Sequence, residues 1–303
     1  MLTTLARMAG FRRAFAVGKV LGELEYRITW RRRRRCERDM ALALARPIGD
    51  AWVTAQLRRA HHLNAHGILE VLAMLVRRQD RRTLASRIVV EGTEHLVAAL
   101  TQGRGAILLA THAGNAVLLA AELVAKGLPV SVVYRQARMA PPAFLGRGYA
   151  RYGMEAILAN EGVRAYARMR HAVKSERILL VTIDQGVKRP QDGVPVRFLG
   201  KTMSMAAGPA QLVRHNRVPV LPVLATGYDG AWHFRIEPPL TLAPGPLATV
   251  VEALARASER QALLHPELWS WHHRRWRKQP FAHATIPDWD EGGEPCSTST
   301  NRP

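Results

Sequence analysis

Apolar positions along the chain change their spacing near residue 85. Before that point they recur at the three-to-four-residue period of an amphipathic helix, most clearly over residues 50–80. After it, short continuous apolar runs alternate with amphipathic stretches. This change predicts a helical N-terminal region followed by strands that alternate with helices.

The apolar runs after residue 85 define the expected sheet. They are continuously apolar rather than alternating, which indicates strands that are buried on both faces. The expected strands are 87–92, 105–111, 129–135, 155–159, 177–184, 218–226 and 232–240, and the expected helices are 93–103, 118–124, 140–153, 162–175, 206–216 and 246–264. We therefore predict an α/β fold, in which a mostly parallel buried sheet is flanked by helices and preceded by a helical N-terminal region.

The pattern divides the chain into three segments. Residues 1–85 form the helical region, for which we expect membrane association, and residues 86–283 form the α/β domain. Residues 284–303 are rich in Pro, Gly, Ser and Thr and are expected to be disordered. We expect no signal peptide and no spanning helix. Residues 105–121 are uncharged, but His112, Gly114 and Asn115 interrupt them midway.

The charge balance indicates which kinds of partner the chain attracts. The chain carries 44 Lys and Arg against 24 Asp and Glu, a formal net charge of +20. Such a chain attracts anions: a phospholipid surface, nucleic acid, an acidic carrier protein or a phosphorylated substrate. Its two cysteines, Cys36 and Cys296, have no close partner in sequence, which argues against a disulfide framework or a cysteine-based zinc site. We expect no metal and no cofactor.

Two basic or aromatic segments each allow two interpretations. Residues 1–30 are basic and amphipathic, and Arg31–Arg35 follow directly. They form either a membrane-docking surface or a domain-packing helix with a solvated face. Trp269, Trp271 and Trp276 form either an interfacial aromatic belt or core tryptophans that close the domain.

Polar residues follow several of the expected strands. His112 and Asn115 come after the strand 105–111, Arg135 ends the strand 129–135, and Asp184 with Gln185 ends the strand 177–184. Sites in open α/β sheets gather at the carboxyl ends of strands. Asn115 can cap the following helix, and Gly114 lets backbone approach closely. A further tight turn at Phe198, Leu199 and Gly200 precedes a helix start that can hold an anion.

The order of these motifs resembles one family. They are "THAGN", "VVYR", "ARYG", "TIDQG", "VPVRFLGKTMSMAAGPAQL", "VPVLPV" and "PELWSWHHRRW", spread over about residues 10–280. The chain is similar to the lipid A biosynthesis acyltransferases (late lauroyl and myristoyl acyltransferases) of the lysophospholipid acyltransferase superfamily. The resemblance implies a membrane-associated enzyme at the cytoplasmic face of a bacterial inner membrane. Its partners would be an acyl carrier protein or coenzyme A thioester, a glycolipid acceptor and an anionic membrane surface.

The same resemblance implies roles for individual residues. His112 corresponds to the general base that activates the acceptor hydroxyl, and Asp184 to a strand-end aspartate of the family. Arg151 in "ARYG" matches a family arginine suited to a phosphate or an acyl carbonyl. Asn115, Arg135, Gln185 and Gly200 complete the expected substrate-binding set.

One position departs from the family pattern. The family places an acidic residue four intervening residues after its histidine, to orient the imidazole. Here that position is Val117, and the nearest acid on the same expected helix, Glu122, is about 15 Å along the axis. Asp184, a carbonyl or a water could orient His112 instead.

Three functions therefore remain open at this stage. The first is an active acyltransferase with His112 as base, and the second is a catalytically weakened homologue that binds lipid or a partner. The third, nucleic-acid binding by arginine-rich helices, ranks last, since only 6% of the chain is aromatic and no nucleic-acid motif is present.

Overall fold

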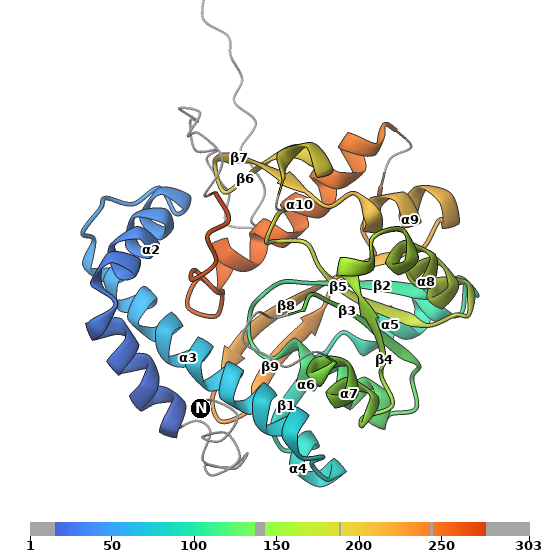
Figure 1. Ribbon diagram of the computed structural model, residues 1–303, viewed down its shortest axis with the longest axis horizontal. Coiled ribbons are helices and arrows are strands. Elements are labelled where there is room, and N and C mark those ends of the chain that lie inside the picture. The colour runs from blue at the N-terminus through green and yellow to red at the C-terminus, as the bar shows by residue number, and fades with distance from the viewer. Residues whose placement is uncertain (1–15, 137–142, 188, 243–244, 277–303) are drawn as a thin grey trace, which may run out of the picture.

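The computed structural model describes residues 16–136, 143–187, 189–242 and 245–276. A seven-stranded sheet forms its centre (Figure 1). In spatial order the strands are β1 (Ile88–Glu91), β9 (Trp232–Ile236), β8 (Val220–Tyr228), β2 (Ala106–Ala110), β5 (Ile178–Thr182), β3 (Val130–Tyr134) and β4 (Glu155–Leu158). Neighbouring strands are parallel except β8 and β9. The predicted mostly parallel α/β fold is confirmed.

Helices pack on both sides of this sheet, with α6 and α7 on one side and α9 and α10 on the other (Figure 1). The helices after β1 are α5 (Thr93–Leu100), α6 (Ala116–Ala125), α7 (Phe144–Ala150), α8 (Val163–Lys174), α9 (Gly208–Asn216) and α10 (Leu247–Leu264). The expected helix over 140–153 is shorter here and ends before Arg151. Its first three residues lie outside the described residues.

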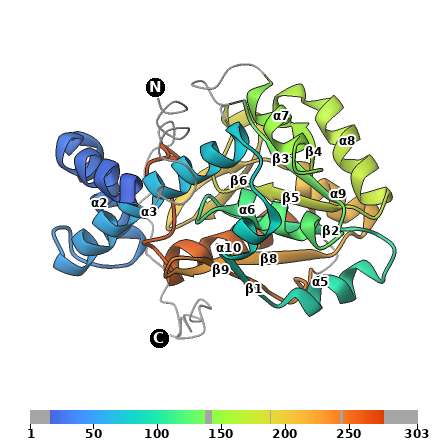
Figure 2. The ribbon, with the colours of Figure 1, turned by 90° about the horizontal axis from the view of Figure 1, so that it is seen from below.

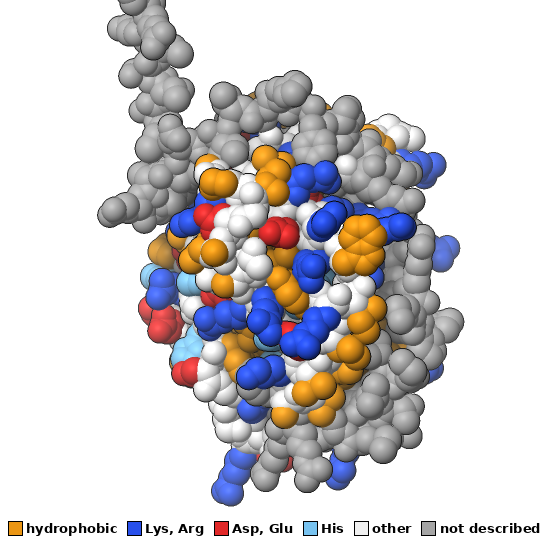
Figure 3. Space-filling view, turned by 90° about the vertical axis from the view of Figure 1, so that its left-hand side faces the viewer, with side chains coloured by type: hydrophobic (Ala, Val, Ile, Leu, Met, Phe, Trp, Pro, Cys, Tyr) orange, Lys and Arg blue, Asp and Glu red, His pale blue; other side chains and the backbone are white. Residues whose placement is uncertain are grey.

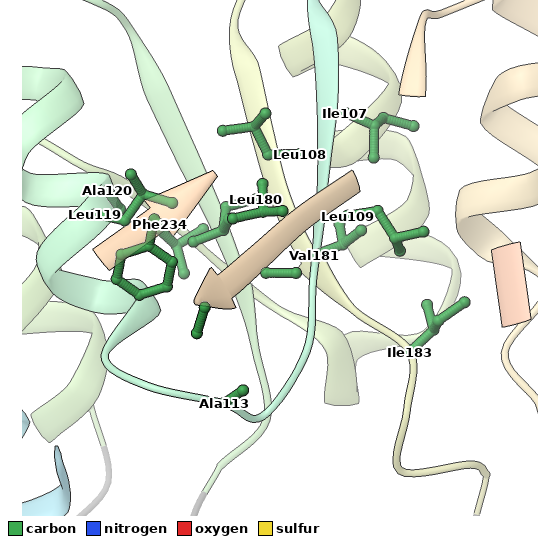
Figure 4. Close-up of a cluster of buried hydrophobic side chains, with 14 of the residues drawn as sticks. Ile107, Leu108, Leu109, Ala113, Leu119, Ala120, Leu180, Val181, Ile183 and Phe234 are labelled. Carbon is green, nitrogen blue, oxygen red and sulfur yellow. The ribbon is translucent and has the colours of Figure 1, made fainter. Parts of the chain in front are cut away.

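The two central strands show why the sheet is buried. Every residue of β2 is buried, and so are the first four of β5. Their aliphatic side chains pack between the helix layers together with Leu119 and Phe234 (Figure 4). A strand covered on both faces must be continuously apolar, which accounts for the runs that predicted it.

One pair of strands differs from the expectation. Residues 194–205 form an antiparallel hairpin, β6 (Val194–Phe198) and β7 (Lys201–Met205), which the sequence interpretation treated as a loop with a tight turn. The turn itself is where expected, at Leu199 and Gly200, and both have a left-handed backbone. The hairpin was missed because β6 alternates in burial, unlike the continuous runs used to find the other strands.

The helical N-terminal region precedes the sheet, as expected. Residues 16–28 are helical, followed by α2 (Trp30–Ala43), α3 (Ala51–Val76) and α4 (Arg81–Ala85). In the views of Figures 1 and 2, this region stands beside the sheet. Among the described residues, no helix combines the length and apolar character needed to cross a bilayer.

A segment after α10, residues 265–276, joins the N-terminal helices to the sheet. The Cys36 thiol and the Arg35 guanidinium donate to the carbonyls of Trp271 and His272, at 3.2 Å each. Trp269 and Trp271 are buried, so the core interpretation is confirmed for these two tryptophans. The expected tail over 284–303 lies outside the described residues.

Candidate active site

The register of two neighbouring strands brings His112 and Asp184 together. In the parallel β2–β5 pair, Ala110 lies opposite Thr182, the last residue of each strand. His112 and Asp184 each follow two positions later, so the two side chains leave the same edge of the sheet side by side. This edge is the carboxyl end of the strands, where α/β folds place their sites.

The two side chains form a close hydrogen-bonded pair. Nδ1 of His112 lies 2.6 Å from Oδ1 of Asp184, and the backbone N–H of His112 donates to Oδ2 at 3.2 Å. The carboxylate has no exposed surface, whereas the imidazole is 32% exposed. Asp184 therefore holds the ring through Nδ1 and leaves Nε2 for a different partner.

The surroundings of Asp184 keep it ionised. Burial alone would raise the pKa of its carboxyl, but His112 and the Arg275 guanidinium outweigh burial and hold that pKa well below its usual range. Arg275 donates to Oδ2 at 2.9 Å and to the Asp184 carbonyl at 2.6 Å, and the Trp269 indole donates to Oδ2 at 3.0 Å. An ionised carboxylate on Nδ1 places the imidazole proton there, so Nε2 carries a lone pair.

The other face of the imidazole meets Gln185 and His273. The Gln185 amide nitrogen lies 2.7 Å from Nε2 of His112 and 3.0 Å from Nε2 of His273. Burial, with a smaller contribution from the Arg275 guanidinium, lowers the pKa of His273 to about 3. His273 is therefore neutral at ordinary pH and adds no charge beside the base.

The turn after β2 is shaped by Gly114 and Asn115. Gly114 has φ +58°, and a Cβ there would lie 3.2 Å from ring atoms of Trp232 and Phe234. Asn115 caps α6 as expected, since its side chain accepts from the Leu118 N–H at 3.0 Å. Its amide group donates to buried Glu70 at 3.0 Å. These contacts fix the path of the chain immediately after His112.

A cavity of about 900 Å³ opens beside the accessible face of His112. This volume is at the upper end of the range for small-ligand sites. Most of its wall is apolar, and its polar lining includes His112, Gln185 and His273. The apolar lining includes Val71, Val117, Leu145, Tyr149, Met169 and Leu180.

The expected substrate-binding residues separate into two groups. Asn115, Arg135 and Gln185 line the cavity. Arg151 and Gly200 are not among its lining residues. The Arg151 guanidinium donates to the carbonyls of Leu75 and Val76 at the end of α3, and Gly200 forms the β6–β7 turn.

Sequence reasoning did not single out Arg275, Trp269 or His273 as site residues. They lie 85 to 91 positions after the residues they contact, Asp184 and Gln185. No local spacing links such distant positions. The signal available was the density of Trp, His and Arg in "WSWHHRRW", which was interpreted as a belt or a core.

The fold and site define a protein with a histidine–carboxylate pair at the edge of a parallel sheet, facing a large apolar cavity. The family model of the bacterial lipid A biosynthesis acyltransferases matches residues 2–278, so the chain belongs to this family. The resemblance inferred from the motifs is therefore confirmed.

Curated relatives fall in the same family. The chain is 27% identical over 204 residues to a phosphatidylinositol mannoside acyltransferase of Mycobacterium tuberculosis, covering 65% of this chain and 63% of the relative. It is 26% identical over 202 residues to the enzyme of the same name from Mycolicibacterium smegmatis, covering 65% of each. The matched region thus spans less than two thirds of each relative.

The contact between Asp184 and His112 changes what a carboxylate at position 117 is expected to do. Because Asp184 already holds Nδ1 of His112, we expect Val117→Glu to lower acyl transfer about tenfold or more rather than raise it. The carboxylate introduced by Val117→Glu would enter a mostly apolar cavity wall, where burying its charge is costly. Initial rates and melting temperatures of Val117→Glu and of Val117→Gln, which adds similar volume without charge, test this. A higher rate for Val117→Glu would mean that the lack of an acidic residue at position 117 limits catalysis.

Proposed function

We propose that the protein is an active acyltransferase that moves a fatty acyl chain from a thioester to a glycolipid hydroxyl, with His112 as general base. The observation that carries this proposal is the 2.6 Å pair between His112 and Asp184, in which His112 also lines the apolar cavity. The weakened-homologue alternative depended on Val117. Asp184 supplies the hydrogen bond whose absence motivated it.

The geometry suggests how the reaction proceeds. The acceptor hydroxyl replaces the Gln185 amide at Nε2 of His112, which removes its proton as the oxygen attacks the thioester carbonyl carbon. Asp184 stabilises the resulting imidazolium through Nδ1. When the tetrahedral intermediate collapses, the carbon–sulfur bond breaks and the departing sulfur takes the proton from His112. The products are an ester and a free thiol.

The cavity and the charges support the proposed substrates. An apolar wall suits an acyl chain, and Arg135 lines the cavity with an exposed side chain. Its guanidinium donates to the Gly186 carbonyl at 3.2 Å, which leaves further donors for a phosphate. Both proposed donors, acyl carrier protein and coenzyme A, are anionic, as the net charge of +20 favours. The family favours a lipid A precursor as acceptor, and the relatives favour a phosphatidylinositol mannoside.

A thioester assay with matched acceptors tests the proposal. Purified protein would receive acyl-coenzyme A or acyl carrier protein thioester together with a lipid A precursor, a phosphatidylinositol mannoside or phosphatidylglycerol as a sugar-free control. We expect thiol release that depends on a glycolipid, with the acyl mass added to that lipid. If the rate of thiol release is the same with and without each acceptor, the protein only hydrolyses the thioester, and the proposal is contradicted.

We also propose that the N-terminal region docks on an anionic membrane surface, at the cytoplasmic face of the inner membrane. On the surface of the N-terminal helices, apolar side chains are exposed among cations. Figure 3 views the molecule from this side and shows Lys and Arg gathered with hydrophobic side chains. Arg31 and Arg34 stack on Trp30, and Arg46 stacks on Trp52. The exposed apolar residues are Val20, Leu24, Ile28, Trp30, Ile48 and Trp52. Aromatic and aliphatic groups ringed by arginine suit a lipid headgroup layer.

We expect Ile28→Asp to weaken binding to phosphatidylglycerol vesicles about tenfold, because it places a negative charge on this surface. Val97→Asp is the matched control, since Val97 on α5 is 54% exposed and Ile28 is 65% exposed. Vesicle co-sedimentation at low and high salt gives both affinities. Equal losses for the two variants, or binding that ignores salt, would place the lipid contact elsewhere.

A further inference from the structure

Three potential metal ligands converge outside the residues that line the active-site cavity. They are Glu25 on the N-terminal helix, His61 on α3 and His272 after α10. Oε2 of Glu25 lies 3.6 Å from Nδ1 of His61 and 3.5 Å from Nε2 of His272. The two imidazole nitrogens are 3.3 Å apart. The three atoms therefore form a nearly equilateral triangle.

The size of this triangle fits a tetrahedral metal ion. An ion about 0.7 Å above the plane of the triangle would lie about 2.1 Å from each corner, within the range of about 2.0–2.2 Å at which zinc binds imidazole nitrogen and carboxylate oxygen. Ligand atoms of a tetrahedral zinc ion stand about 3.4 Å apart, whereas octahedral neighbours at similar bond lengths stand about 3.0 Å apart. The observed separations match the tetrahedral arrangement.

The ligand types also suit a cation. A carboxylate oxygen and imidazole nitrogens are groups that zinc binds in proteins.

The surroundings hold the ligands in place. Arg32 pairs with the other Glu25 oxygen, Oε1, and leaves Oε2 for the triangle. His61 is fully buried, and its ring is edge-to-face with Tyr26 at 5.3 Å. Nε2 of His61 has no hydrogen-bond partner within the described part of the chain, so a proton held there leaves the Nδ1 lone pair free for a metal. Glu25 and His272 are partly exposed, which leaves room for a water as fourth ligand.

We propose that Glu25, His61 and His272 bind one zinc ion, with a water completing a tetrahedral site. The ion joins the N-terminal helix and α3 to the segment that carries His273 and Arg275. Its role is structural, because it fixes the segment whose Arg275 holds Asp184 in place. It lies outside the proposed reaction, which needs no metal at this position.

Two neighbouring histidines provide matched controls for a metal-binding test. His62 follows His61 but turns to Glu23 at 2.8 Å, and His273 follows His272 but contacts Gln185. The full chain would be treated with chelator and titrated with zinc by calorimetry, for wild type, Glu25→Gln, His272→Gln, His62→Gln and His273→Gln. We expect one zinc per wild-type chain, affinity at least about tenfold weaker in the first two variants, and little change in the two neighbour variants.

Cobalt substitution and thermal melting complete the test. Cobalt(II) in the wild-type protein should give the intense visible bands of a tetrahedral site, and these should be lost in Glu25→Gln. Zinc should raise the melting temperature of wild type but not of His272→Gln. Because Glu25 and His272 lie partly at the surface, circular dichroism should show both variants folded. Absence of stoichiometric zinc, or equal loss in the neighbour variants, would overturn the site and leave the proposed acyltransferase function untouched.

Discussion

We expect the His112→Ala variant to lose acyl transfer by about 10⁴-fold, with a small change in KM. A positioned general base contributes up to about 10⁴ to the rate. Among the described residues that line the cavity, the one other imidazole is that of His273. His273, the nearest imidazole, bonds to Gln185 instead and lacks a carboxylate partner among the described residues. Single-turnover thiol release, measured with excess enzyme, reports the chemical step directly.

Folding is the control for this variant. The His112 side chain is partly exposed, so its removal costs little packing, and the melting temperature should change by a few degrees at most. His233→Ala removes a similarly exposed histidine, which pairs with Asp229 and is not among the cavity-lining residues, and should keep full activity. An unchanged rate in His112→Ala would remove the base from the mechanism.

The second large effect is expected from Asp184→Asn, with turnover falling about 10³- to 10⁴-fold. Asparagine keeps the shape but cannot stabilise the imidazolium, and its amide can turn His112 to the wrong tautomer. The corresponding change in serine proteases lowers turnover by about 10⁴. Because Asp184 does not touch the substrate, the loss should appear in turnover rather than in KM.

Asp184→Asn will also destabilise the fold, so a second variant must separate the two effects. It leaves Arg275 buried without its carboxylate, a change that costs about 3–5 kcal/mol. Asp39→Asn breaks another buried pair, with Lys201 at 2.8 Å, and should cost similar stability while leaving the rate nearly unchanged. If both variants lose activity in proportion to their melting temperatures, Asp184 has only a structural role.

The sheet could be predicted from the sequence for physical reasons, and so could both His112 and Asp184 as site residues. A strand buried on both faces must be apolar throughout, so β2, β3 and β5 stand out, and their carboxyl ends identify His112, Arg135 and Asp184 as neighbours. The contact between His112 and Asp184 depends on the order and register of the strands, which local patterns do not encode. It was therefore one of several alternatives for orienting the base.

Contacts from distant segments could not be predicted. Arg275 and Trp269 reach Asp184 because the segment after α10 folds back beside the turn that follows β2. The sequence of α10 does not indicate where that segment goes. The same holds for Glu25, His61 and His272, which lie on three separate segments. The absence of a cysteine motif argued against one kind of zinc site, but histidine and carboxylate ligands at such spacing have no sequence signature.

The most direct test of the His112–Asp184 pair compares His112→Ala with the double variant His112→Ala/Asp184→Asn in single-turnover acyl transfer. If Asp184 acts through His112, removing it after His112 is gone costs little, and the two rates should agree within about threefold. A further loss of about 10³-fold in the double variant, equal to that of Asp184→Asn alone, would show that the two residues act independently and would contradict the pair as the catalytic unit.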